Sequence, residues 1–155
     1  TPTWRDAYRE LPFVFCASAA AAAGGLALVA TPVAEAAPAR RLGAAGAVVE
    51  LAAAQVMERS MGLTAEPLRT GRAGAWMRAA TALTAAGGFG AVLSGRRRWA
   101  AVLSGAALMA GSLCTRMGIF EAGMASARDP RYTVVPQRER LDRGEPVRFE
   151  RGADG

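Results

Sequence analysis

Three charged side chains interrupt or border long apolar stretches, and they are the residues best placed to do chemistry. Glu50 lies within LGAAGAVVELAAAQVM (42–57), Glu58 follows that stretch, and Arg116 follows WAAVLSGAALMAGSLCT (99–115). At a rise of about 1.5 Å per residue, Glu50 lies about 12 Å into its predicted helix, and the other two lie about 25 Å into theirs. A carboxyl group near the middle of a membrane-spanning helix is expected to act as a proton relay or a ligand contact.

Each of these residues also has a structural interpretation. Glu50 could be a protonated carboxyl group that is hydrogen-bonded to a hydroxyl on a neighbouring helix, from Thr81, Thr84 or Ser104. Arg116 and Glu58 are predicted to pair near one membrane boundary if the second and fourth helices are neighbours, and a structural pair is favoured over a catalytic one. Glu121, at the exit of the last helix, is a further candidate for an intramembrane polar or proton-relay group.

The composition excludes several classes of site. The chain has no His, which excludes bis-His haem, a His-ligated metal, and Ser-His or Cys-His catalytic pairs. Cys16 and Cys114 lie in apolar runs without metal-ligand spacing, so both are predicted to be buried free thiols. The net charge is +6, but the arginines lie between and after apolar segments rather than along one face, which argues against nucleic acid. No catalytic residue or metal site is predicted, and no catalysis is expected from this chain alone.

Four apolar stretches must position these residues. The first holds twenty consecutive residues without a charge (11–30), about the length that a bilayer core requires. None of the stretches shows period-two alternation, and their links suit antiparallel helices. The alternative is a soluble Ala-rich bundle, which should show a charged face that these stretches lack. The sequence therefore predicts an all-α, integral membrane four-helix bundle over residues 11–125, after an interfacial flank at 1–10, with helices at about 11–33, 39–59, 76–95 and 98–122.

The flanks of these stretches carry a weaker topological signal. The aromatic residues Trp4, Tyr8, Trp76 and Trp99 stand near the predicted helix ends, where an aromatic belt would lie. Most arginines fall on the side that holds both termini, so both termini of the segment are predicted to be cytoplasmic. The triple-Arg turn 96–98 on the other side argues against this orientation.

Small residues four apart recur within the apolar stretches. Examples are Ala21 with Gly25, Ala86 with Gly90, Ala101 with Gly105, and Ala107 with Gly111. In a membrane such pairs let helix backbones approach closely. In an Ala-rich chain they also arise by chance, so only the Gly-containing clusters carry information.

The segment 126–155 is predicted to be an extended, mixed-charge cytoplasmic tail. Pro130, Pro136 and Pro146 argue against a regular helix, and Gly123 is a candidate C-cap for the helix before it. The predicted docking residues of this tail are Tyr132, Val134, Val135 and Arg138. The alternative is a chain terminus with no fixed partner.

Two parts of the chain resemble a known family. RMGIFEAG followed by ASARDPRYTVVPQRERL resembles the C-terminus of bacterial NrfD-type membrane subunits, the family that includes the polysulfide reductase membrane subunit. WRDAYRELPFVF and MERSMGLTAEPLRTGRAG resemble the second half of actinobacterial members. The likeness spans essentially the whole chain, and the tail and the RTGRAG link are its specific parts. It implies an eight-helix fold in two bundles, of which this chain matches the second and is expected to be a segment of something longer.

The resemblance implies a function and partners. Such subunits bind no haem and exchange electrons between membrane quinone, such as menaquinone, and an iron–sulfur subunit that serves a molybdopterin catalytic subunit. Actinobacterial relatives belong to formate dehydrogenase-like complexes. The expected partners are the N-terminal four-helix half, those two subunits, lipid and quinone in the bacterial inner membrane. The family's quinone pocket lies mainly in the first bundle, so the resemblance implies only a supporting or proton-conducting role for Glu50, Glu58, Arg116 and Glu121.

Two functions of other classes remain open. A small four-helix transporter is supported mainly by Glu50, although the chain shows no internal repeat, which such transporters often have. A purely structural membrane anchor would tolerate Gln at Glu50 and Glu58. The sequence does not identify the substrate of the complex.

Overall fold

The computed structural model describes residues 2–131, 134–135, 138 and 142, and these residues form helices and turns without a strand. Four helices are long: α2 (Leu11–Ala30), α3 (Ala37–Ser60), α5 (Gly71–Leu93) and α6 (Arg98–Arg128). Three short elements accompany them: α1 (Pro2–Asp6), the 3₁₀ helix η1 (Gly62–Ala65) and α4 (Glu66–Arg69). At about 1.5 Å per residue, even the shortest long helix reaches about 30 Å.

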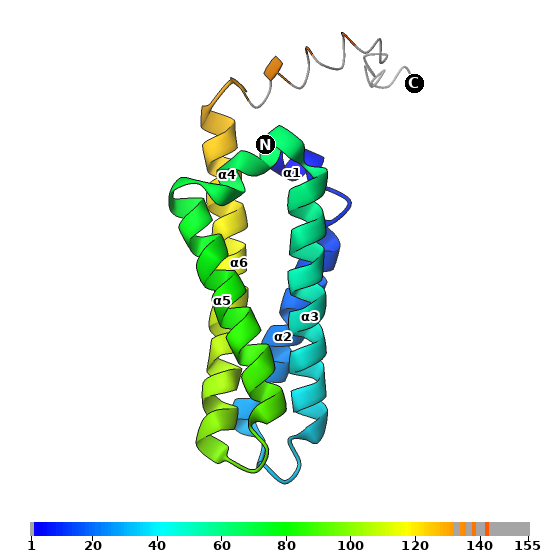
Figure 1. Ribbon diagram of the computed structural model, residues 1–155, viewed down its shortest axis with the longest axis vertical. Coiled ribbons are helices and arrows are strands. Elements are labelled where there is room, and N and C mark those ends of the chain that lie inside the picture. The colour runs from blue at the N-terminus through cyan, green and yellow to red at the C-terminus, as the bar shows by residue number, and fades with distance from the viewer. Residues whose placement is uncertain (1, 132–133, 136–137, 139–141, 143–155) are drawn as a thin grey trace, which may run out of the picture.

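The four long helices lie side by side and alternate in direction (Figure 1). Around the bundle the order is α2, α3, α5, α6, so that α2 and α5 each pack between α3 and α6, which lie at opposite corners. One end, here called the terminal end, holds α1, η1, α4 and the last turn of α6. The other, here called the loop end, holds the turns 31–36 and 94–97.

Two helix boundaries differ by five residues or more from those that the sequence predicts, and the others by three residues or fewer. α5 begins at Gly71 rather than 76, because Gly71 adopts a φ of 58° between α4 and α5. α6 continues to Arg128 rather than 122, so the predicted C-cap at Gly123 is wrong. Gly123 lies inside the helix because the Trp4 ring packs against it, and Trp4 Nε1 donates a hydrogen bond of 3.0 Å to the carbonyl oxygen of Ile119.

Directly after α6, Asp129 is extended and Pro130 lies in a turn. The described residues that follow take helical rather than extended backbone: Arg131, Val134, Val135, Arg138 and Asp142. The Val134 amide donates to the Pro130 carbonyl over 2.9 Å, and Pro130 precedes this turn, where its missing N–H costs nothing. The Arg131 side chain and amide donate to the Asp129 carboxylate, which lowers the pKa of Asp129. This contact is therefore present at neutral pH and is lost only as the pH falls through that lowered pKa.

At the loop end, Arg98 caps the last turn of α2. Its Nη1 donates hydrogen bonds of 3.1 Å to the Leu28 carbonyl and 2.8 Å to the Thr31 carbonyl, and Nη2 donates to the Val29 carbonyl. A cation is favoured at the C-terminus of a helix, where the last carbonyl groups have no partner within the helix. The triple-Arg turn therefore has a structural use that is independent of membrane orientation.

We expect Arg98→Gln to lower the free energy of unfolding by about 2 kcal/mol, since it removes charge-assisted hydrogen bonds to three carbonyl groups. The matched control is Arg96→Gln, because the described structure gives the Arg96 side chain no hydrogen bond or ion pair. Denaturant titration followed by helical circular dichroism measures both variants. Equal losses of unfolding free energy in the two variants would contradict the role of Arg98 as a cap of α2.

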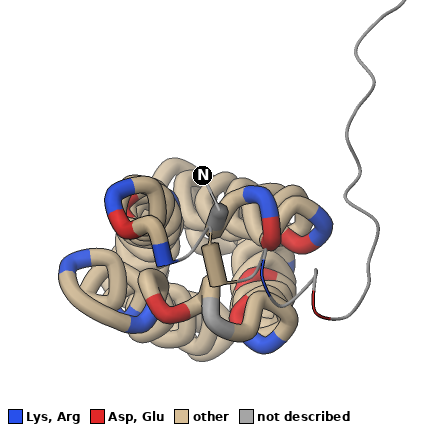
Figure 2. The backbone as a smooth tube through the Cα atoms, turned by 90° about the horizontal axis from the view of Figure 1, so that it is seen from above, with Lys and Arg blue, Asp and Glu red and all other residues tan. Residues whose placement is uncertain are grey.

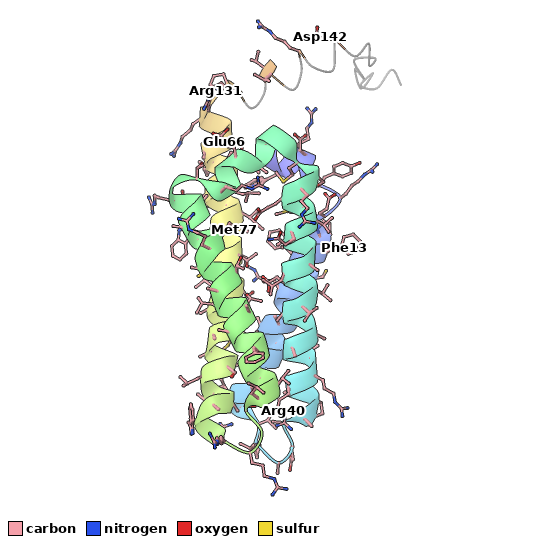
Figure 3. All side chains as sticks on the ribbon, in the orientation of Figure 1. Phe13, Arg40, Glu66, Met77, Arg131 and Asp142 are labelled. Atoms are coloured by element: carbon pink, nitrogen blue, oxygen red, sulfur yellow. The ribbon has the colours of Figure 1, made fainter. Side chains whose placement is uncertain are left out.

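The interior of the bundle is built from small residues, and most large apolar side chains face outward. Apart from Leu28, Leu108 and a few others, the buried apolar positions of the long helices are mostly Ala, with buried Gly beside them. Phe13 projects away from the bundle in Figure 3 and is 67% exposed. The other exposed large apolar side chains on the long helices include Leu26, Val48, Val49, Val56, Phe89, Val92, Leu93, Leu103, Leu113 and Phe120.

Glycines set the close approach of the helices. A Cβ atom on Gly25 of α2 would lie 2.6 Å from the Gly105 carbonyl oxygen of α6. A Cβ atom on Gly24 would lie 2.5 Å from the Gly43 Cα atom of α3. Of the predicted small pairs, those containing Gly25, Gly105 and Gly111 lie at such contacts, and Gly90 packs against the Ser104 side chain.

Within the described residues, two helices are long and apolar enough to cross a membrane, Leu11–Ala30 and Arg98–Arg128. Only 39% of the α2 window is buried inside the structure, so most of this apolar helix faces outward. Seen along the long axis, charged residues are distributed over the helices rather than gathered on one side (Figure 2). The chain is therefore all-helical, with weak evidence for membrane association from these two helices.

Candidate functional site

A layer of buried polar side chains crosses the middle of the bundle. It consists of Ser18 on α2, Glu50 on α3, Thr84 on α5, and Ser112 and Thr115 on α6. On every long helix these residues lie between two apolar clusters. The terminal-end cluster includes Val14, Met57, Met77 and Ile119, and the loop-end cluster includes Ala21, Ala47, Ala91 and Leu108. This arrangement isolates the polar layer from both ends of the molecule.

Glu50 is the buried acid of this layer and is 2% exposed. Thr115 Oγ1 donates a hydrogen bond of 2.7 Å to Glu50 Oε1 across the diagonal of the bundle, and it also lies 3.1 Å from the Gly111 carbonyl oxygen. Within the described structure, Glu50 Oε2 and Thr84 Oγ1 are buried without a hydrogen-bond partner. The layer therefore contains two polar atoms whose desolvation is uncompensated.

Beside Glu50, serines from two helices hold Arg116. Ser18 Oγ donates to Ser112 Oγ over 2.8 Å. Arg116 Nη1 donates to Ser112 Oγ, to the Ser112 carbonyl over 3.2 Å and to Ser18 Oγ over 3.5 Å. Ser112 lies four residues, or about 6 Å, further from the terminal end than Arg116. Along the long axis, the guanidinium therefore points toward mid-height of the bundle. An arginine that reached for the nearer end of the molecule would point the opposite way.

Arg116 itself is exposed at the side of the bundle. Its neighbours at helical spacing on α6, Leu113 and Phe120, are exposed apolar side chains. The described residues place no carboxylate within salt-bridge distance of Arg116. An outward-facing cation thus interrupts an otherwise apolar side of α2 and α6.

The predicted pair of Arg116 with Glu58 is wrong, because Arg116 lies at the exposed side of α6 and bonds the serines of α2 and α6, away from α3. Glu58 instead pairs with Arg69, whose Nε lies 3.2 Å from Glu58 Oε2. Glu121 lies 3.7 Å from Arg72 Nη2, at the terminal end. The four predicted polar residues therefore fall into separate places, with only Glu50 and Arg116 at the polar layer.

The hydroxyl partner of Glu50 is none of the three that the sequence suggested, but Thr115 on the diagonally opposite helix α6. Thr81 donates to the Met77 carbonyl and Ser104 to the Ala100 carbonyl, while Thr84 is buried without a partner. Ser18, Ser112 and Thr115 were missed by sequence reasoning. Their signal is a hydroxyl within a charge-free stretch, and the spacing of 112 and 115 places both on one side of a helix.

The predicted docking residues of the tail fall partly outside the described structure, since Tyr132 is not among the described residues. Val134 is 42% exposed, Val135 is half-buried and Arg138 is exposed. Cys114 is a buried free thiol as predicted, but the predicted burial of Cys16 is wrong, because this free thiol is exposed on α2. Among the described residues, no group of three or more His, Cys, Asp or Glu side chains could hold a metal ion.

The unpartnered hydroxyl of Thr84 leads to a direct prediction. We expect Thr84→Val to leave the free energy of unfolding within about 1 kcal/mol of the original or to raise it, because it replaces a buried, unbonded hydroxyl by a methyl group. Thr115→Val is the matched variant. It should lower the free energy of unfolding by about 2 kcal/mol, because it leaves Glu50 without its hydrogen-bond donor. A loss at Thr84 as large as that at Thr115 would show that Thr84 has a partner.

Comparison with known proteins gives no relative: the chain matches no family model, and no curated protein or solved structure is significantly similar to it.

Proposed function

We propose that this chain is a membrane-embedded helical bundle in which all four long helices span the bilayer. The observation that carries the proposal is the inside-out distribution of side chains, with alanine and glycine inside and large apolar residues outside. Helices associate in lipid through small residues and buried hydrogen bonds rather than through burial of large apolar groups. In water the same surface would be an apolar patch much larger than a soluble monomer normally exposes.

The bundle is proposed to serve as the membrane subunit, or the C-terminal half of one, of a quinone-linked oxidoreductase in the bacterial inner membrane. This assignment rests on the resemblance to NrfD-type subunits. An iron–sulfur subunit and a molybdopterin subunit would be its partners, in a complex similar to formate dehydrogenase, and both termini of the segment would face the cytoplasm. Quinone would bind to the full subunit, and this chain would carry no haem.

The exposure of Arg116 supports a partner within the membrane. A cation that faces lipid at this depth is costly, and a helix that carries a carboxylate would remove that cost. A symmetric dimer through the same face would bring two Arg116 side chains together, which disfavours a second copy as the partner there. The N-terminal four-helix half is the proposed occupant of this face.

Glu50 supports a second function of the transporter class. A buried carboxyl group with one unpartnered oxygen, beside hydroxyl groups in a polar layer, can accept and release a proton or contact a small ligand. In the quinone-linked complex the same group would support proton movement through the second bundle. A transporter would do so without redox partners.

One purification separates these functions. The chain is tagged, its native membranes are solubilised in mild detergent, and the purified material is analysed for iron, molybdenum or tungsten, and extractable quinone. The quinone-linked complex predicts that the metals and quinone co-purify in fixed ratio. A membrane-embedded chain that purifies as a homo-oligomer without metals or quinone would contradict it and favour the transporter.

A further inference from the structure

A groove of about 460 Å³ opens on the side of the bundle near the terminal end. It lies between α3, α4 and α5, and its lining includes Glu58, Leu68, Arg69, Met77, Arg78 and Thr81. Arg78 lies about 10 Å from the start of α5 and is the last charged residue before the charge-free stretch 79–95. The groove therefore lies where the charged end meets the apolar side.

The groove carries two guanidinium groups and one carboxylate. Arg69 is held by Glu58 through Nε, and its Nη2 donates to the Glu58 carbonyl over 3.3 Å. Arg78 Nη1 donates to the Arg69 carbonyl over 3.4 Å. Among the described residues, Arg69 Nη1 and Arg78 Nη2 have no hydrogen-bond partner. The groove thus has a net positive charge and donors available to an anion.

The rest of the groove is apolar. Leu68 and Met77 are buried at 1% and 6% exposure and form part of its wall. Thr81 and Ala82 lie one turn beyond Arg78, toward the middle of the bundle. Val48 and Phe89, each seven residues from a lining residue of the groove (Gln55 and Ala82), continue the exposed apolar surface on α3 and α5. A ligand that fits a groove that is positively charged at one end and apolar at the other has an anionic head and apolar chains that run toward the middle of the bundle.

We propose that this groove binds the headgroup of an anionic phospholipid, with its phosphate on Arg69 and Arg78 and its acyl chains along the apolar side of α3 and α5. Guanidinium groups bind phosphate through paired, charge-assisted hydrogen bonds, and basic pockets between membrane helices bind anionic headgroups. A neutral quinone would leave the positive charge uncompensated, and free phosphate would leave the apolar wall unused. The proposal rests on the proposed membrane embedding but not on the redox partners.

The test uses native mass spectrometry of the full chain in detergent, titrated with dioleoyl phosphatidylglycerol, dioleoyl phosphatidylcholine or inorganic phosphate. Arg78→Gln is the decisive variant because, within the described structure, the Arg78 side chain makes a single hydrogen bond to the rest of the fold. Arg69→Gln/Arg78→Gln is the stronger one. The control, Arg41→Gln/Arg96→Gln, removes the same charge at the loop end from two exposed side chains.

The original chain is expected to bind phosphatidylglycerol at least tenfold more tightly than phosphatidylcholine, and Arg78→Gln to lose about tenfold of that affinity while the control changes less than twofold. Equal binding of both lipids, an equal loss in the control, or displacement of the lipid by inorganic phosphate or by a quinone would each overturn the lipid site. Reconstitution into phosphatidylcholine nanodiscs is scored separately. A chain that enters no bilayer refutes the proposed function, whereas one that enters without lipid selectivity refutes only the groove.

Discussion

Gly105→Leu is expected to destabilise the bundle by about 3 kcal/mol, the upper part of the usual range for overpacking. A Cβ atom at this position would collide with the Gly25 carbonyl oxygen of α2 and lie 3.0 Å from Val29 Cγ2. The two helices cannot separate locally, because Arg98 also holds the last turn of α2 at the loop end. Denaturant titration of helical circular dichroism in detergent measures the effect.

The neighbouring variant Ala106→Leu supplies the control. Ala106 is exposed on the same turn of α6, so a leucine there should change the free energy of unfolding by less than about 0.5 kcal/mol. If both leucines are tolerated equally, α2 and α6 do not approach at Gly105. That result would contradict the close packing of α2 and α6 through small residues, on which the proposed membrane embedding depends.

The second large effect is expected at Glu50. Glu50→Gln should preserve the fold, since the amide oxygen can still accept the Thr115 hydrogen bond. In the native complex it should reduce proton-coupled quinol turnover at least a hundredfold if the carboxyl group relays protons, because an amide cannot exchange a proton. Turnover and proton uptake are measured together in membranes that contain the full complex.

Two further variants show what Glu50 does. Glu58→Gln alters a half-buried acid that pairs with Arg69 at the terminal end, so it should leave proton coupling unchanged. Glu50→Lys places a cation in a buried site without an acidic partner, so it should lower the free energy of unfolding by about 3 kcal/mol or more. Unaltered turnover and proton uptake in Glu50→Gln would leave Glu50 with a structural role only, as a membrane anchor would predict.

The sequence predicted the four long helices because each contains a long stretch with at most one charge, and a low density of charge is a local property. Two of their ends were misplaced for reasons that are not local. α6 passes through Gly123 because Trp4, more than a hundred residues earlier in the chain, packs on it and bonds the Ile119 carbonyl. α5 begins before the predicted residue 76 and includes Arg72, because charges near its start lie at the terminal end, where they do not need to be buried.

The candidate site was predicted less completely. Glu50 was identified because a lone acid in an apolar stretch is conspicuous, but its partner depends on the order of the helices around the bundle. A linear sequence does not show that α3 and α6 face each other across a diagonal, and so Arg116 was assigned to Glu58 rather than to the serines of α2 and α6. The hydroxyls of Ser18, Ser112 and Thr115 carry no charge and were therefore missed in so Ala-rich a chain.

The most direct test of the proposed embedding measures what surrounds the exposed side chains at the middle of the bundle. Nitroxide labels are attached to cysteines introduced at Val48, Ala85 and Leu113, and at Arg96 as the loop-end control, in a Cys16→Ala background because Cys16 is exposed. In lipid vesicles, oxygen should collide with the three mid-bundle labels far more often than a water-soluble nickel chelate, with the reverse at Arg96. Chelate collisions at all four sites, with the chain remaining in the aqueous fraction, would contradict a membrane-embedded bundle.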